Sequence, residues 1–91
     1  MELIEEVKKD LRINHDKLDE SISADIEFTL ELIKTAGVRP DTSDLLVKRA
    51  VKNYLRFLHN FNGEADRYKA AFDELLKTMC LSSERRLDYE E

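Results

Sequence analysis

The sequence predicts a compact all-α domain of four helices with a loose C-terminal tail. Two glycines and one proline among 91 residues leave few places for turns. Apolar residues recur at three- and four-residue steps, and no stretch alternates apolar and polar residues over the length of a strand. A chain of this length forms one hydrophobic core. We therefore assign residues 1–83 to one helical domain and residues 84–91 to a flexible acidic tail.

The first helix is expected over about residues 2–11, because its apolar residues share one face. These residues are Leu3, Ile4, Val7 and Leu11. We expect a polar break at Asn14-His15 and a second helix over about residues 17–36. Asp16 can accept a hydrogen bond from the amides of its first turn. Gly37 suits a left-handed closing position, and Pro40 prevents continuation of the helix.

The inward face of the second helix is expected to comprise Leu18, Ile22, Ile26, Thr29, Leu30 and Ile33. A third helix should begin after Asp41 or Thr42 and end near residue 60. Its expected inward residues are Val47, Ala50, Val51, Tyr54, Leu55 and Leu58.

A break at Asn62-Gly63 separates the third helix from the fourth, which is expected over about residues 64–81. The residues that this last helix should bury are Tyr68, Phe72, Leu75, Leu76 and Met79. The tail then follows Ser82-Ser83, and Leu87 and Tyr89 are its apolar residues.

Charge is distributed unevenly along the chain. The net charge of −5 disfavours a general nucleic-acid binder. Nevertheless, residues 45–63 contain four basic residues and no acidic one. At 100° per residue these bases, together with His59, lie opposite the apolar face of the third helix. They are Lys48, Arg49, Lys52 and Arg56. Opposite the core face of the second helix lie Glu20, Glu27 and Glu31. Both stripes can be ordinary solvated faces, or they can meet between neighbouring copies of the chain.

No group of residues predicts catalysis, and we expect neither an enzyme nor a cofactor. His15 and His59 are far apart in sequence, and neither has a His or Cys partner at metal-ligand spacing. Cys80 is expected to be a half-buried small apolar residue rather than a nucleophile. No glycine-rich phosphate loop and no serine elbow is present.

The same residues predict a cytoplasmic location without a membrane span. The apolar runs are too short to cross a bilayer, and the opening Met1-Glu2-Leu3 does not resemble a secretion signal. A single cysteine is typical of a reducing compartment.

Three phenylalanines lie off the centre of their helical faces. Phe28 is either an edge-of-core residue or a contact to a neighbouring subunit, and Phe57 poses the same alternative on the third helix. Phe61 is expected to pack on the fourth helix across the Asn62-Gly63 turn.

Residues 3–16 read Leu-Ile-Glu-Glu-Val-Lys-Lys-Asp-Leu-Arg-Ile-Asn-His-Asp. This segment resembles the opening helix, Leu-Arg-Ile and Asp-rich turn of the phage head–tail connector family, the adaptors that form a ring beneath the portal. The resemblance continues through the long helix to Ala36-Gly37-Val38 and through residues 46–58 with Tyr54. Residues 61–68, Phe-Asn-Gly-Glu-Ala-Asp-Arg-Tyr, are similar to the linker before the last helix of short members. In total the resemblance covers about residues 2–83.

The resemblance implies a structural subunit of a ring, twelve-fold on the phage particle, that completes the head after DNA packaging. Its partners would be sister subunits, the portal protein, and a stopper or tail-completion protein. Packaged DNA would pass through the channel without sequence-specific binding. The protein would be found in the host cytoplasm during assembly and then in the virion. The family's C-terminal segment reaches toward the portal, which implies partner contacts for Leu87 and Tyr89.

A different class of function stays open at this point. In a small helical DNA-binding regulator, the third helix would read the groove. Lys48, Arg49, Lys52 and Arg56 would contact phosphates, and Asn53 would contact a base edge.

Overall fold

The structure is a computed structural model that describes residues 2–86, apart from the side chain of Ser83. In this part of the chain the secondary structure consists of four α-helices and two short 3-10 turns. The helices are α1 (Leu3–Asp10), α2 (Asp19–Thr35), α3 (Leu45–Leu58) and α4 (Ala65–Leu81). This arrangement confirms the predicted all-α fold.

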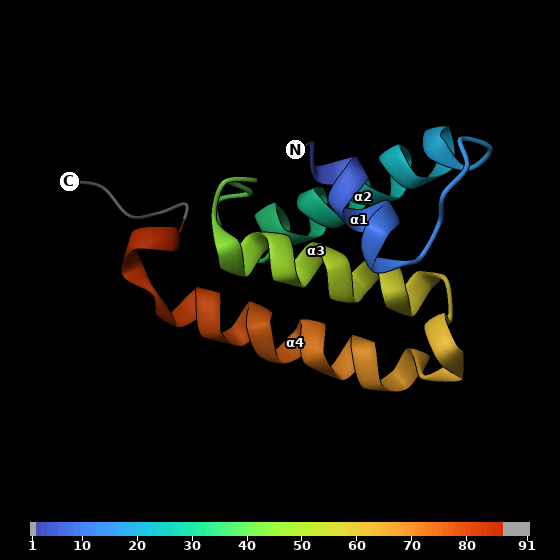
Figure 1. Ribbon diagram of the computed structural model, residues 1–91. Helices are drawn as coiled ribbons and strands as arrows, with labels where there is room; N and C mark the ends of the chain where they lie inside the picture. Colours follow the sequence, from blue (N-terminus) through green and yellow to red (C-terminus); the bar gives the residue numbers. More distant parts are fainter. Residues whose placement is uncertain (1, 87–91) are drawn as a thin grey trace.

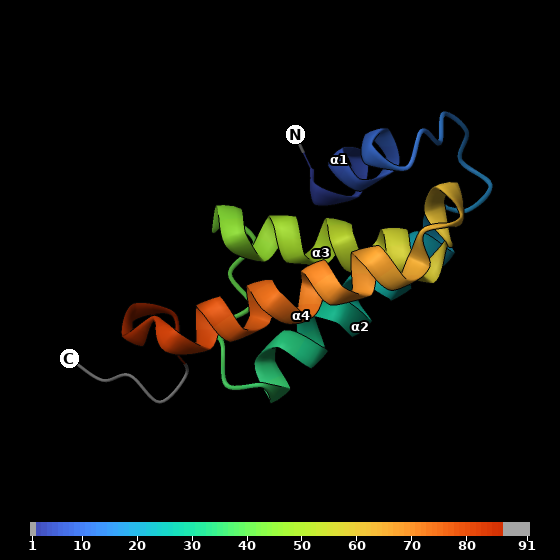
Figure 2. The same cartoon turned by 90° about the horizontal axis from the view of Figure 1, so that it is seen from below.

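Helix α3 lies at the centre of the molecule. Helices α3 and α4 run antiparallel and side by side, joined by the 3-10 turn Phe61–Gly63 (Figure 1). Helices α1 and α2 lie across α3 on its side away from α4 (Figure 1), toward different flanks of it (Figure 2), and they contact each other. All four helices contribute buried residues to the core around α3.

The core comprises most of the apolar residues that periodicity placed inward. Its buried members are Val7, Leu11, Ile22, Ile26, Ile33, Val38, Val47, Ala50, Val51, Tyr54, Leu55, Phe72 and Met79. Two expected core residues are instead exposed, Leu18 by 39% and Leu58 by 42%. Leu18 precedes the first turn of α2 and Leu58 is the last residue of α3, so both lie where few neighbours can cover them.

The ends of three helices show how the chain reverses. Arg12, Gly37 and Asn60 have φ values of +61°, +94° and +47° after α1, α2 and α3. Gly37 fulfils its predicted role, and Val38 donates back to the carbonyl of Ile33. The first break, however, occurs at Arg12 rather than at Asn14-His15, because Arg12 and Ile13 donate back to the last turn of α1. A left-handed arginine costs about 1 kcal/mol relative to glycine.

Two predicted helix starts were wrong. Helix α2 begins at Asp19, and Asp16 accepts a hydrogen bond from the side chain of Lys8 instead of capping α2. Helix α3 begins after Asp44, whose Oδ1 accepts from the amide of Leu46 at 2.9 Å. Asp41 only closes the preceding turn on Ser43. Before α3 several short polar side chains compete for the cap and packing selects Asp44, whereas α2 starts after Leu18 without a side-chain cap.

The beginning of the expected tail is held in place. Residues Ser83–Arg85 form a 3-10 turn, and Arg86 forms an antiparallel bridge with Val38. The amide of Arg39 donates to the carbonyl of Arg85 at 2.7 Å, and the Nε of Arg85 lies 2.6 Å from Asp44 Oδ2. Residues 84–86 therefore pack against the α2–α3 connection. Leu87 and Tyr89 lie outside the described residues.

The assignment of the α3 cap can be tested by comparing two aspartates. We expect Asp44→Ala to lower the free energy of unfolding by about 1–2 kcal/mol, because both the α3 cap and the partner of Arg85 are removed. Asp16→Ala should change it by less than about 0.5 kcal/mol, because Asp16 is exposed. Urea unfolding of both variants at neutral pH measures the difference. A larger loss for Asp16→Ala would instead identify Asp16 as the important cap.

Candidate interaction surfaces

The basic residues of α3 do not form a free stripe, because α1 packs over one side of them. Lys48 and Lys52 each place Nζ 3.4 Å from a carboxylate oxygen of Glu6. Arg56 binds Asp10 in a bidentate pair, with Nε 2.6 Å from Oδ2 and Nη2 on Oδ1. These side chains are partly buried. The bases thus join α1 to α3 within one chain.

The sequence contains a signal for this pairing. Glu6 and Asp10 are four residues apart, and Lys48, Lys52 and Arg56 follow one another at the same interval. Residues at this spacing share one helical face. Two such ridges of opposite charge match each other when two helices pack alongside. Sequence alone gave no reason to place α1, rather than another copy, beside α3.

The electrostatics of the contact follow from this geometry. Partial burial by itself would raise the pKa of Glu6, but hydrogen bonds from Lys52 and Lys48 outweigh it and hold the pKa of the carboxyl below its ordinary value. The hydrogen bond to Asp10 raises the pKa of Arg56. Both shifts favour the charged forms at neutral pH.

Arg56 also connects α1 to the turn before α4. Its guanidinium carbon lies 5.3 Å from the centre of the Phe61 ring and 5.1 Å from that of Tyr68. The rings of Phe61 and Tyr68 are themselves 6.2 Å apart. Phe61 therefore packs on α4 across the turn, as predicted. The favourable contact of a cation with aromatic faces adds to the ion pair.

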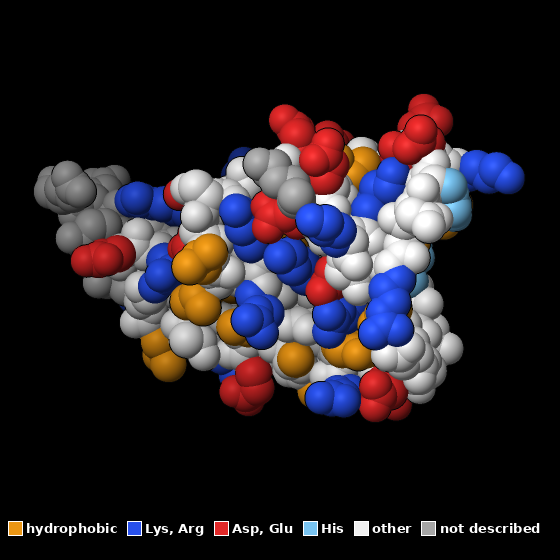
Figure 3. Space-filling model, viewed as in Figure 1, with side chains coloured by type: hydrophobic (Ala, Val, Ile, Leu, Met, Phe, Trp, Pro, Cys, Tyr) orange, Lys and Arg blue, Asp and Glu red, His pale blue; other side chains and the backbone are white. Residues whose placement is uncertain are grey.

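Arg49 lies on the side of α3 that α1 leaves open. It is exposed, and among the described residues no ion pair or hydrogen bond of its side chain is found. It borders a polar hollow of about 300 Å³. The lining residues are Asp10, Arg49, Lys52, Asn53 and Arg56. Figure 3 shows Lys and Arg side chains gathered over α3 on this face.

The acidic residues of α2 form a second charged surface, separate from this hollow, which α1 and α3 line. All three are exposed, and none forms an ion pair within residues 2–86: Glu20, Glu27 and Glu31. This agrees with the predicted acidic stripe, although whether it contacts a partner stays a prediction.

Phe28 lies beside these glutamates and is 54% exposed. Its ring centre is 6.4 Å from that of Tyr54. Phe57 is half-buried, with its ring 5.4 Å from Tyr54. Phe57 thus belongs to the edge of the core, whereas Phe28 only touches the core with one side and presents the other to solvent.

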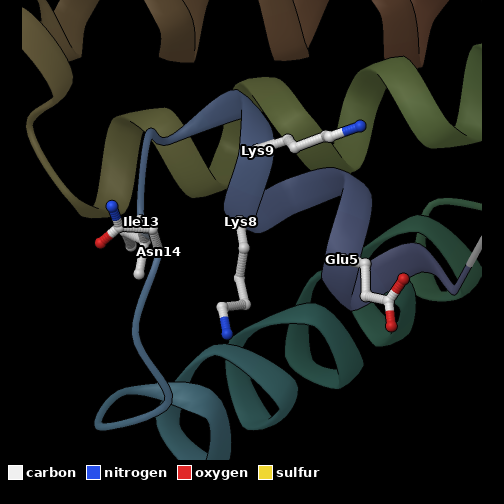
Figure 4. Close-up of a pocket in the computed structure, with 5 residues that line it drawn as sticks. All are labelled: Glu5, Lys8, Lys9, Ile13 and Asn14. Carbon is white, nitrogen blue, oxygen red and sulfur yellow. The ribbon is translucent and has the colours of Figure 1, made fainter.

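Among the other hollows, two differ from this one in their linings. One of about 220 Å³ is bordered by Glu5, Lys8, Lys9, Ile13 and Asn14, and Figure 4 shows these side chains pointing in different directions. Lys8 points toward α2 there, where its Nζ lies 2.7 Å from Asp19. The other is an open groove of about 660 Å³ between the end of α2 and α4. It is lined by Ala36, Asp73, Leu76, Lys77, Cys80 and Leu81.

The histidines and the cysteine do not come together. Nδ1 of His15 accepts from the amide of Lys17, and Nε2 of His59 lies 3.7 Å from Asp25. Cys80 is half-buried, with Sγ 3.5 Å from the carbonyl of Ala36. In the part of the chain that the structure describes, no three His, Cys, Asp or Glu side chains form a metal-binding group. Nor does any helix between residues 2 and 86 have the length and apolar character to cross a bilayer.

No family model, curated protein or solved structure matches this chain. The functional interpretation therefore depends on the surfaces described above.

The contact between Glu6 and the two lysines makes stability depend on pH. Because the pKa of Glu6 is lowered in the folded state, the unfolded chain takes up this proton first as the pH falls. The stabilisation is complete above the ordinary value of 4.5 and is lost as the pH falls through the lower folded pKa. We therefore expect the stability difference between wild type and Glu6→Gln to shrink from pH 7 to pH 3 in urea unfolding. The exposed neighbour Glu5, changed to Gln, is the control and should give no such trend.

Proposed function

We propose that this chain is a structural subunit of a phage or prophage head–tail connector ring. In this role it joins the portal to the stopper or tail-completion protein and completes the head after DNA packaging. It assembles in the host cytoplasm and becomes part of the virion. The resemblance of residues 2–83 to the connector family motivates the proposal.

The single observation that carries the proposal is the separation of charge on the folded subunit. A ring requires each subunit to present two different and complementary surfaces, one to each neighbour. Exposed glutamates lie on α2, and the open basic hollow is lined by α1 and α3. A half-exposed phenylalanine beside the glutamates adds the aromatic residue that interfaces favour.

The pairing within the chain also counts against a DNA-binding regulator. A helix that reads DNA must offer its bases to phosphates, but Glu6 and Asp10 already occupy Lys48, Lys52 and Arg56. A phosphate at this position would meet two carboxylates. The net charge of −5 opposes binding further. An acidic subunit is better suited to a channel through which DNA slides without being held.

The direct test is co-purification with a phage portal protein, followed by light scattering and electron microscopy of the complex. We expect rings bound to the portal and no retention on duplex DNA. Salt-sensitive binding to duplex DNA that is lost in a Lys52→Glu/Arg56→Glu variant would contradict the proposal and identify a regulator.

Phe28 supplies a prediction about assembly. Phe28→Asp should leave the helical circular dichroism in place and reduce ring formation on the portal by at least tenfold, because a charge would replace an interface aromatic ring. Leu81→Asp is the matched control, since Leu81 is 87% exposed at the end of α4. Unfolding of the Phe28→Asp variant, or assembly equal to that of the control, would place Phe28 in the core alone.

A further inference from the structure

The hollow on α3 is built to receive carboxylates. It already accommodates Asp10, which receives two hydrogen bonds from Arg56. Arg49, on its rim, is the cation for which the described residues supply no acid. A guanidinium has five donors, and Arg56 uses only two nitrogens on Asp10, so it can bind a second acid as well. The site therefore has room and donors for further acidic groups.

The glutamates of α2 match these cations in spacing. Glu20 and Glu27 are seven residues apart, as are Arg49 and Arg56. In an α-helix seven residues complete about two turns and advance about 10.5 Å, so both pairs lie on one face at the same separation. With the two helices antiparallel, Glu27 meets Arg49 while Glu20 meets Arg56. Ala24, exposed halfway between the two glutamates, leaves space for close approach.

We propose that the hollow beside Arg49 binds the acidic face of α2 from a second copy of this chain, with Glu27 on Arg49 and Glu20 on Arg56. This inference rests on the proposed ring function and specifies its subunit contact. The contact is head-to-tail, because each copy presents its hollow to one neighbour and its α2 face to the other. Repetition of such a contact produces a ring or a filament.

A second copy fits this hollow better than nucleic acid does. The hollow contains a fixed carboxylate, and Glu6 lies on the neighbouring lysines. Both would repel the phosphates that follow one another along a nucleic acid. Two glutamates on one helix bring only two carboxylates to the hollow, so fewer like charges meet Asp10 than along a nucleic acid. The exposed Phe28, next to Glu27, can in addition lie against the aliphatic part of a basic side chain.

Charge reversal tests the contact. Arg49→Glu and Glu27→Arg should each weaken association by at least about tenfold, because each places like charges in contact. An equimolar mixture of the two variants should assemble again in alternating order, since each broken surface then meets a reversed partner. Sedimentation velocity with the portal present measures both effects. Chemical cross-linking tests whether residue 49 of one copy meets residue 27 of the next.

Two exposed residues on α4 provide matched controls of the same charge change, Lys77→Glu and Glu74→Arg. Both should assemble as the wild type does. If the wild type associates and neither Arg49→Glu nor Glu27→Arg weakens that association, this contact is overturned but the ring function stands. The same conclusion follows if the mixture of the two variants does not associate again. Absence of any wild-type association, alone or on the portal, overturns both. Loss of duplex DNA binding on Arg49→Glu would instead identify nucleic acid as the occupant.

Discussion

Helix α3 packs against α1, α2 and α4, and its contact with α4 is the most extensive in the molecule. Its different sides therefore make different kinds of contact. Valine, alanine and leucine residues cover the side toward α2 and α4, and lysine and arginine cover the side toward α1. An isolated α3 would expose its apolar side to water and leave its basic side without acidic partners. The other helices bury the apolar side, and α1 supplies the acids.

The ion pairs between α1 and α3 influence position more than stability. Partly buried pairs lose hydration as they form, so their net contribution is modest even where the geometry is good. Their spacing nevertheless favours an arrangement in which the acidic ridge of α1 faces the basic ridge of α3. Arg56 extends this constraint to Phe61 and Tyr68, and so links the first helix to the turn before the last one. Packing around α3 thus pairs Lys48, Lys52 and Arg56 with acids of α1 and leaves Arg49 without an acidic partner among the described residues.

This division of roles bears on the assembly that we propose. The acids of α1 limit the open basic surface to a narrow hollow, and in the proposed contact this favours a partner with few, well-spaced carboxylates over a polyanion. The exposed glutamates of α2 have such a spacing. Specific recognition of this type depends as much on the acids that repel the wrong partner as on the cations that attract the right one.

The sequence by itself determined the four helices, the core faces and the closing glycine at Gly37, because periodicity and left-handed backbone positions are local properties. It also located the acidic side of α2, which stays exposed. Tertiary structure alone decided that Asp44 rather than Asp41 caps α3, and that Arg12 ends the first helix. It alone paired Lys48, Lys52 and Arg56 with α1. These outcomes depend on which segments lie side by side, and a charged ridge read along the chain carries no information about the neighbour that will cover it.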